Sequence, residues 1–404
     1  TTAMKEEAKP ALVPKLRFPE FRGAEPWKVS RFDEVLSPVV RQRPKPAEAY
    51  LGLGLRSHGK GTFLKPLEDP AKNSMDQLYE VKAHDLIVNI TFAWEGAVAI
   101  AQECDEGALV SHRFPTYTFE KGRTAPEFFR YIILGKQFVY NLGVISPGGA
   151  GRNRVLSKND FLKLRVALPM PAEQQKIAEC LSSMDDLMAA QARKVDALKT
   201  HKKGLMQQLF PREGETQPRL RFPEFQNAGE WKKKSLGTFI KEFRGKSTIQ
   251  DEYEVLTSAR SGLVRQREYY DNDRITERDN IGFNIIPPYY LTYRSRSDDR
   301  QFYFNENNLG IVGIVSVYYP VFRVIGGSNK FLIELLSAFS RVVGKYSVGT
   351  SQTVLSLNQL GRISLPFPPT EEEQQRIASC LSSPDALITA ETQKHEALKT
   401  HKKG

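Results

Sequence analysis

Glu173-Gln-Gln-Lys-Ile-Ala178 and Glu373-Gln-Gln-Arg-Ile-Ala378 are two copies of one segment, and each opens the same pattern. The eight residues 197–204, Ala-Leu-Lys-Thr-His-Lys-Lys-Gly, return letter for letter as residues 397–404. A match of this length that includes a histidine and paired lysines is not chance. The chain is therefore an internal repeat, in which one structural unit is written twice.

The repeat also has matching beginnings. Leu16-Arg-Phe-Pro-Glu-Phe21 recurs unchanged as residues 220–225, and Trp27 recurs as Trp231. Between these matching ends, residues 30–150 and 235–345 share no obvious run of identity. The pattern indicates a common frame that carries a different insert in each half, as expected for one task performed on two targets. The alternative is a duplicated scaffold whose inserts drifted without consequence.

Each copy of the frame predicts a long helix. Pro171 and Glu173 suit a first helical turn, and the following apolar residues alternate in steps of four and three, which is the 3.5-residue period of a coiled coil. The predicted seam contains Ile177, Leu181, Met184, Met188, Val195, Leu198, Leu205, Leu209, Ile377, Leu381, Ile388 and Leu398.

The second copy keeps this phase less regularly. Ser383-Pro384-Asp385 is typical of a helix start and predicts a break there, with a matching break near Ser183. A connecting domain of about 155 residues allows the two helices to run antiparallel and to pack on each other. The alternative is two unrelated surface helices on separate domains.

The predicted fold class is α+β: two globular target domains separated by two long helices in an antiparallel coiled coil, with a pseudo-twofold internal repeat. The domain boundaries follow from the repeat. They are a disordered leader at 1–14, a first domain at 15–170, a first spacer helix at 171–213, a second domain at 214–369 and a second spacer helix at 370–404.

The inserts mix short β-type runs with one predicted helix each. In the first, residues 85–91 and 96–102 predict strands and residues 126–134 a helix. In the second, the predicted strands are 283–286, 310–319 and 321–325, and the predicted helix is 329–339.

Charge favours a polyanionic partner for these inserts. The chain has 58 basic and 47 acidic residues, a net charge of +11. Loops in both inserts combine basic, small polar and aromatic side chains, of the kinds that pair with base edges and phosphates. For any single loop, a solvated basic surface is the commoner explanation. The candidate DNA-binding residues are Arg41, Arg43, Arg56, Ser57, His58, Lys60, Arg152, Arg154, Arg244, Lys246, Ser258, Arg260, Arg265, Gln266, Arg267, Tyr293, Arg294, Arg296, Ser351 and Gln352.

Motifs for catalysis are not evident. The loop from Gly54 to Gly61 nearly spells a P-loop, but Gly61 stands where the Mg²⁺-binding Ser or Thr belongs. Ile286-Pro-Pro-Tyr lacks the amide that precedes the proline pair in adenine methyltransferases. The three cysteines have neither metal-ligand nor disulfide spacing. We therefore expect no catalytic residue, metal site or cofactor in this chain.

These features together identify a family. Two variable inserts, each preceded by R-F-P-E-F…W and followed by P-x-P…E-Q-Q-[KR]-I-A and A-L-K-T-H-K-K-G, resemble the specificity subunits (HsdS) of type I restriction–modification enzymes. The resemblance covers residues 15–404. It implies that each insert is a target recognition domain for one half of a gapped, asymmetric double-stranded DNA site, and that the helices act as a ruler between the domains.

The resemblance also implies the partners. Methyltransferase (M) subunits, two in number, and restriction (R) subunits would join this chain, and S-adenosylmethionine, ATP and Mg²⁺ would serve those partners in DNA methylation and cleavage. We expect the prokaryotic cytoplasm, associated with the nucleoid, and no membrane partner, since no run of about 18 apolar residues occurs. Two alternatives remain: a self-sufficient methyltransferase or nuclease, and a coiled-coil adaptor that binds proteins.

Overall fold

The computed structural model describes residues 13–149, 154–260, 262–270 and 279–403. Most of the predicted leader and the candidate Arg152 lie outside these ranges. The chain divides into two compact units, residues 1–186 and 187–404, so that the first long helix belongs partly to each. Among the described residues, no helix is both long and apolar enough to cross a bilayer.

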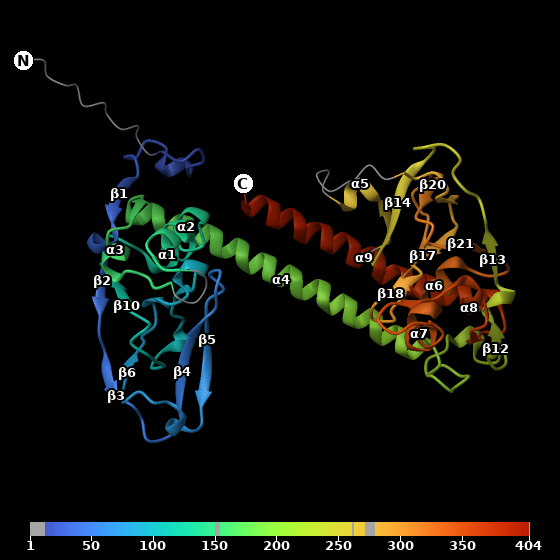
Figure 1. Ribbon diagram of the computed structural model, residues 1–404, viewed down its shortest axis with the longest axis horizontal. Coiled ribbons are helices and arrows are strands. Elements are labelled where there is room, and N and C mark those ends of the chain that lie inside the picture. Colours follow the sequence, from blue (N-terminus) through green and yellow to red (C-terminus); the bar gives the residue numbers. More distant parts are fainter. Residues whose placement is uncertain (1–12, 150–153, 261, 271–278, 404) are drawn as a thin grey trace, which may run out of the picture. The chain divides into compact units, whose positions relative to one another are not determined.

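The described residues of unit 1 form three sheets. Their strand orders are β1-β11, β2-β10-β7-β8 and β3-β6-β9-β4-β5. The sheet that contains β3, β4, β5 and β6 extends away from the layer of α1, α2 and α3 (Figure 1). The elements are β1 (Lys28–Arg31), β2 (Leu36–Val39), β3 (Gln42–Pro44), β4 (Tyr50–Leu55), β5 (Thr62–Leu67), β6 (Gln77–Glu80), β7 (Leu86–Val88), β8 (Val98–Ile100), β9 (Leu109–Val110), β10 (Thr116–Phe119), α1 (Pro126–Ile132), α2 (Lys136–Val144), α3 (Lys158–Leu162), β11 (Arg165–Leu168) and α4 (Pro171–Leu209).

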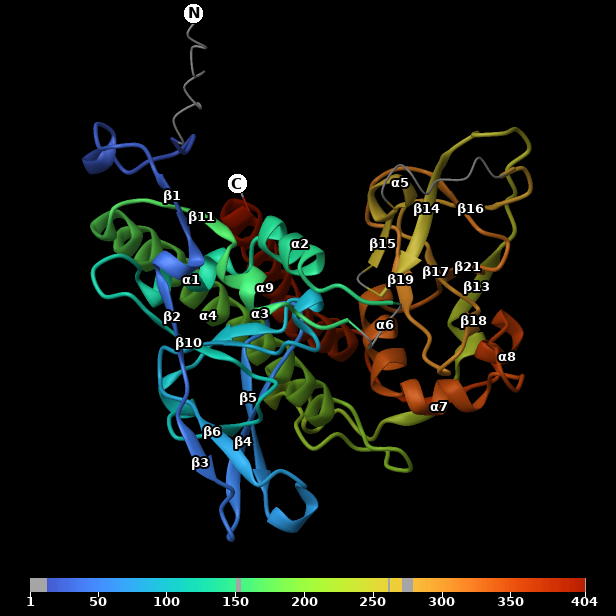
Figure 2. The ribbon, with the colours of Figure 1, turned by 60° about the vertical axis from the view of Figure 1, so that its left-hand side comes forward.

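In unit 2, the residues that the structure describes form four sheets. Their orders are β12-β23, β13-β21-β17-β19, β15-β14-β20-β16 and β18-β22. Strands β14 and β16 lie at the end of the unit opposite α7 and α8 (Figure 2). The elements are β12 (Lys232–Ser235), β13 (Ile240–Phe243), β14 (Glu254–Ala259), β15 (Gly262–Arg265), α5 (Gln266–Tyr269), β16 (Asn284–Ile286), β17 (Leu291–Tyr293), β18 (Arg296–Ser297), β19 (Phe304–Glu306), β20 (Gly313–Val315), β21 (Val321–Val324), α6 (Asn329–Ala338), α7 (Ser340–Lys345), β22 (Thr353–Val354), α8 (Leu357–Gly361), β23 (Ser364–Phe367) and α9 (Glu371–Lys403).

The inserts share one topology although their sequences share no run of identity. In unit 1 the hairpin strand β4 pairs antiparallel with β5 and parallel with β9, and β9 pairs antiparallel with β6. In unit 2 the strand β14 pairs antiparallel with β15 and parallel with β20, which pairs antiparallel with β16. The inserts are therefore two versions of one domain, and the β4–β5 hairpin corresponds to the β14–β15 hairpin.

The strands and helices predicted in the inserts all exist, although most are shorter than predicted. The predicted strand at 310–319, for example, is ordered only as β20 over three residues. Its flanks bend away, because Gly310 has a positive φ of 71° and Ser316 starts a turn through its hydrogen bond to Tyr319. Element type was therefore readable from the pattern, whereas element length was set by turns.

The predicted breaks in the long helices are wrong. Helix α4 is continuous over 39 residues and passes Ser183, and α9 is continuous over 33 residues with Pro384 inside it. A proline within a helix removes one backbone hydrogen bond and costs about 3 kcal/mol. Contacts on both sides offset this cost, because Leu381 is fully buried and Asp385 binds Lys202 of α4.

Candidate nucleic-acid interface

The repeated frame is held by a buried ion pair that occurs once in each unit. Arg17 donates two hydrogen bonds to the carboxylate of Glu173, at 2.8 and 2.6 Å, and the indole Nε1 of Trp27 donates to the same carboxylate at 3.3 Å. Glu173 lies in the first turn of α4 and is fully buried. The contacts therefore fix the R-F-P-E-F segment to the start of the helix.

The second unit repeats this arrangement. Arg221 donates to Glu373 at 2.8 and 2.8 Å, and Trp231 donates to it at 3.1 Å. Glu373 is 1% exposed, in the first turn of α9. The recurrence of Arg, Trp and Glu at matching places in the sequence thus has one structural cause, a planar guanidinium that satisfies a buried carboxylate through two parallel bonds.

The predicted seam is the least exposed face of both long helices. The seam positions are buried or half-buried, whereas most of the positions between them are exposed. Within unit 2, Gln191 of α4 contacts Glu391 of α9, and Lys202 of α4 contacts Asp385 of α9. Because the number rises along α4 and falls along α9, these segments run antiparallel, as predicted.

A buried charge cluster joins the helix pair to the second insert. The Lys202 Nζ atom lies 2.7 Å from Glu334 of α6 and 2.6 Å from Asp385 of α9. Burial lowers the pKa of Lys202, but hydrogen bonds to Asp385 and Glu334 more than offset it, so the pKa is raised. Burial raises the pKa of the Glu334 carboxyl. One lysine on the spacer helix thus positions α6 against both long helices.

In unit 1, the loop between β4 and β5 carries exposed basic side chains. It contains Arg56, Ser57, His58 and Lys60; the guanidinium of Arg56 lies 5.2 Å from the ring centroid of Phe63. Lys60 has no ion-pair partner among the described residues. Among the candidates on this loop, Arg56, His58 and Lys60 are exposed, whereas Ser57 is half-buried.

Two other candidates of unit 1 are committed to contacts within the protein. Arg41 is paired with Asp85, which is 2% exposed, and Arg154 donates to the carbonyls of Ser146 and Gly143 while it covers the ring of Trp94. Exposed Arg43 is paired with Glu80 on the five-stranded sheet, at 2.7 Å. The guanidinium groups of Arg41 and Arg154 hold the insert together.

In unit 2, several candidates contact residues between 298 and 318. Arg296 lies 3.9 Å from the ring centroid of Tyr318, and Arg260, at the tip of the β14–β15 hairpin, lies 5.3 Å from that of Tyr303. Arg260 also lies 3.5 Å from Asp299, and Gln352 donates to the adjacent Asp298 at 3.3 Å. We refer to this set as the Arg–Tyr surface: Arg260, Arg294, Arg296, Tyr303, Tyr318, Ser351 and Gln352.

The chemistry of the Arg–Tyr surface suits nucleic acid. Arg294, Tyr303, Tyr318 and Gln352 are exposed. A guanidinium stacked on a tyrosine keeps its N–H groups directed outward at low entropic cost, and these groups can bind phosphate or guanine. The pKa of Asp299 is lowered, chiefly by hydrogen bonds from Ser297 and Gln301, so this carboxylate stays ionised beside Arg260.

The remaining candidates of unit 2 lie elsewhere. Arg244 pairs with Glu242, while Arg265 and Arg267 share Glu254. Lys246 and Gln266 lie near these pairs in sequence, and the hydroxyl of Ser258 accepts from Asn305 at 2.7 Å. The structure therefore does not gather all the basic loops of the second insert into one surface.

One interpretation is wrong. Tyr293 was predicted to contact DNA, but its ring is fully buried in the core and its hydroxyl donates to the carbonyl of Leu355 at 2.9 Å. Burial raises the pKa of this hydroxyl. Tyr293 is buried whereas the next residue, Arg294, is exposed. Neighbouring polar and aromatic residues in the sequence therefore could not distinguish a core strand from a surface loop.

Sequence reasoning also missed two aromatic residues. Tyr318 lies in the predicted strand 310–319 and Tyr303 lies outside the predicted elements, and each lies against an arginine distant in sequence. The sequence offered one weak signal for them: a single tyrosine beside turn residues is expected to be at least partly exposed.

Comparisons with known proteins agree on one family. Residues 229–400 match the family model described as type I restriction modification DNA specificity domain. The chain is 26% identical over 283 residues to the type I restriction enzyme MjaVIII specificity subunit of Methanocaldococcus jannaschii. That alignment covers 61% of this chain and 61% of the relative, which is less than two thirds of its length.

Solved structures share the fold. The type I restriction-modification system S subunit from M. genitalium is similar with a TM-score of 0.60 and 14% identity, covering 97% of each chain. A second similar chain comes from a structure that describes the complex assembly and conformational transition of the type I R-M system. Its TM-score is 0.52 and its sequence identity is 17%, and the match covers 93% of this chain and 95% of that one. The family model matches residues 229–400, and the chain is similar in sequence over 61% of its length, and in fold over 97%, to specificity (S) subunits of type I restriction–modification enzymes.

Proposed function

We propose that the chain recognises a double-stranded DNA site in two separate parts, one through each insert, and brings methyltransferase and restriction subunits to that site. The observation that carries the proposal is the duplication: one insert topology occurs twice, with different residues on its surface. Two readers with different surfaces imply two different half-sites, and hence an asymmetric target.

Surface chemistry supports DNA as the ligand. The β4–β5 hairpin and the corresponding β14–β15 hairpin both carry basic side chains at their tips, Lys60 and Arg260. The net charge of +11 favours attraction to a polyanion. Catalysis would belong to the partner subunits, which would use S-adenosylmethionine for methylation, and ATP and Mg²⁺ for restriction.

The helices support a gapped site. Helix α4 alone has 39 residues and, at about 1.5 Å per residue, a length of about 58 Å, more than one DNA turn of about 34 Å. Inserting one heptad into both α4 and α9 would add about 10 Å, or about three base pairs. We expect a longer gap with unchanged half-sites; changed half-sites at constant gap would contradict the ruler.

Salt dependence tests the ligand class. The full chain, alone and with its methyltransferase subunit, is titrated against duplex DNA at increasing salt. We expect affinity to fall steeply, because each neutralised phosphate releases about 0.9 counterion. Binding that ignores ionic strength, or no binding to DNA by either preparation, would contradict the proposal and favour a protein-binding adaptor.

A further inference from the structure

The loop of the β4–β5 hairpin is fixed to the body of unit 1. The backbone N–H of His58 donates to the carbonyl of Glu95 at 2.7 Å, and that of Gly59 donates to Gly96 at 2.9 Å. The Ser57 hydroxyl donates to the Glu95 carboxylate at 2.8 Å. The loop therefore presents its remaining groups from a defined position.

Glycine favours the close approach of this loop to the residues that follow helix α1. Gly59 has a φ of 64°, in the left-handed region, and a Cβ atom there would lie 2.4 Å from the Cδ2 atom of Leu134. A side chain at this position would strain the backbone and require the side chain of Leu134 to move. The glycine thus allows the basic loop and the end of α1 to approach each other.

A cavity of about 470 Å³ lies at this junction. Its wall combines the hairpin loop, the end of β8 and the last turn of α1. The lining residues are Gly59, Lys60, Gly61, Thr62, Ala99, Ile100, Gln102, Arg130, Ile133 and Leu134.

Two cations line the cavity without a carboxylate partner. Within the described ranges, neither Lys60 nor Arg130 has an ion pair. The hydroxyl of Thr62 donates to Asp105, which is 1% exposed and also accepts from the backbone of Gln102. This carboxylate is buried behind the wall, so the accessible charge at the cavity is positive.

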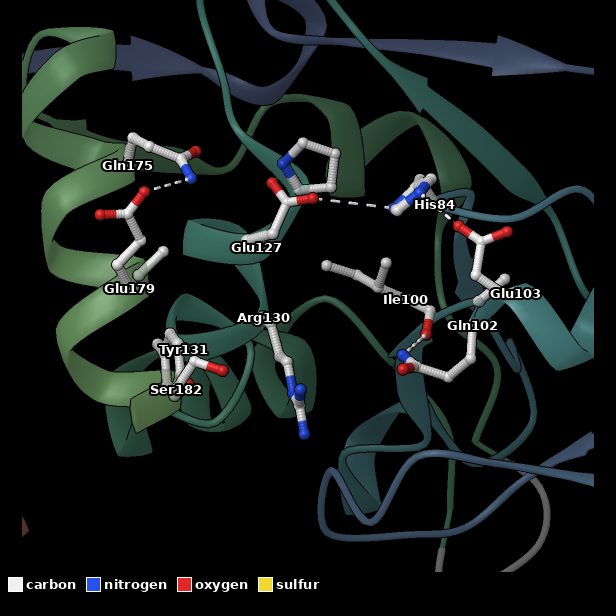
Figure 3. Close-up of a pocket in the computed structure, with 13 residues that line it drawn as sticks. His84, Ile100, Gln102, Glu103, Glu127, Arg130, Tyr131, Gln175, Glu179 and Ser182 are labelled. Atoms are coloured by element: carbon white, nitrogen blue, oxygen red, sulfur yellow. Dashed lines mark hydrogen bonds and ion pairs between the residues drawn. The ribbon is translucent and has the colours of Figure 1, made fainter. Parts of the chain in front are cut away.

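The nearest acidic groups serve a different cavity. Glu103 and Glu127 line a neighbouring space of about 260 Å³, where the ring nitrogens of His84 lie 3.1 and 3.8 Å from them. Figure 3 shows the guanidinium of Arg130 directed away from Glu127 and Glu179. Arg130 lines both spaces, whereas Lys60, Glu103 and Glu127 each line only one of them.

We propose that this cavity binds a phosphate group, with Lys60 and Arg130 as its cationic ligands. A lysine supplies a compact point charge and an arginine a planar fork that matches two phosphate oxygens. The volume leaves room for the sugar that carries the phosphate.

The favoured source is the DNA backbone, and in this respect the inference rests on the proposed function. The corresponding hairpin of unit 2 also carries a basic tip, Arg260, although no sequence identity requires it. A contact to the backbone holds the duplex without reading bases, so it would position the first insert for any sequence.

The test uses the full chain with Lys60→Gln, Arg130→Gln and the double variant. Both side chains are exposed, so folding should be unchanged, which melting curves verify. We expect weaker binding on all duplexes alike, and a salt slope smaller by about 1 for each residue. Exposed Lys136→Gln on α2 is the matched control and should leave the slope unchanged.

The outcomes separate the inference from the function. Unchanged slopes in the variants beside a steep wild-type slope would overturn the phosphate site and leave DNA recognition intact. A wild-type chain without salt-dependent DNA binding would instead contradict the proposed function.

Titration with ATP and with inorganic phosphate distinguishes the source of the phosphate. Micromolar binding of ATP that Arg130→Gln abolishes would assign the cavity to a free nucleotide and overturn the DNA-backbone assignment. Competition with DNA by inorganic phosphate only at millimolar concentrations, lost in the double variant, is the result that we expect.

Discussion

Gln191 and Glu391 occupy the same position of the sequence repeat and contact each other. The amide Nε2 of Gln191 donates to the backbone carbonyl of Glu391 at 2.9 Å and also to its carboxylate. In an antiparallel pair of equivalent helices, only the central position faces its own counterpart. The contact therefore marks the centre of the pairing, and one polar layer in an apolar seam fixes the register.

Lys194→Gln should destabilise the chain in a pH-dependent way. Hydrogen bonds from Lys194 and then Gln191 lower the pKa of Glu391. A carboxyl group whose pKa is lowered in the folded state stabilises the fold at pH values above its unfolded-state pKa of about 4.3. This stabilisation is lost as the pH falls through the folded-state pKa. The variant should melt below wild type at pH 7 and match it near pH 3, in thermal melts followed by circular dichroism. Arg193→Gln, at an exposed position, is the control; an equal deficit at every pH would refute the assignment.

Lys202→Met should cost about 3 kcal/mol of unfolding free energy, because it leaves the buried carboxylate of Glu334 without its cation. Burial already raises the pKa of Glu334, and without Lys202 this pKa rises further. A carboxyl group whose pKa is raised in the folded state destabilises the fold at pH values above its unfolded-state pKa. The loss of unfolding free energy relative to wild type should therefore be larger at pH 8 than at pH 5. Urea unfolding at the two pH values measures it. Lys203→Met, on the exposed side of α4, should cost little; a similar loss in both variants would show that the cluster has no special role.

Glu373→Gln should destabilise unit 2 by about 3 kcal/mol, because it removes the charge that pairs with Arg221 at the start of α9. The exposed pair of Arg376 and Glu224 in the same region is a matched comparison. Glu224→Gln should cost less than about 1 kcal/mol. Calorimetric melting of both variants tests the difference, and equal costs would mean that the frame does not depend on the buried pair.

Arg296→Ala should weaken DNA binding about tenfold, since its guanidinium is the cation of the Arg–Tyr surface that lies nearer to its tyrosine ring, at 3.9 Å against 5.3 Å for Arg260. The loss should concern the half-site of the second insert only. Fluorescence anisotropy with duplexes altered in one half-site or the other measures this, with Arg323→Ala on β21 as the control. Wild-type affinity in the Arg296 variant would exclude the surface as the DNA contact.

The frame could be predicted from the sequence because its parts recur. The long helix in each copy and its seam follow from identities between the two copies, whereas the pairing of Arg17 with Glu173 and of Arg221 with Glu373 was not predicted, although these residues recur. The common topology of the inserts could not be predicted, because strand pairing such as β4 with β9 joins residues distant in the chain and leaves no local signal. For the same reason, the sequence could not tell which candidate arginines are paired within the protein and which are available to a ligand. The pairing of Arg41 with Asp85 and the position of Arg296 over Tyr318 both depend on tertiary contacts.

The most direct test of the central claim is a base-resolution methylation map from cells that co-express this chain with its methyltransferase subunit. We expect a two-part gapped motif, one half of which changes when residues 30–150 are exchanged for those of another specificity subunit, while the other half and the gap persist. A motif that stays unchanged on exchange, or no methylation by a complex that assembles and binds DNA, would contradict the account.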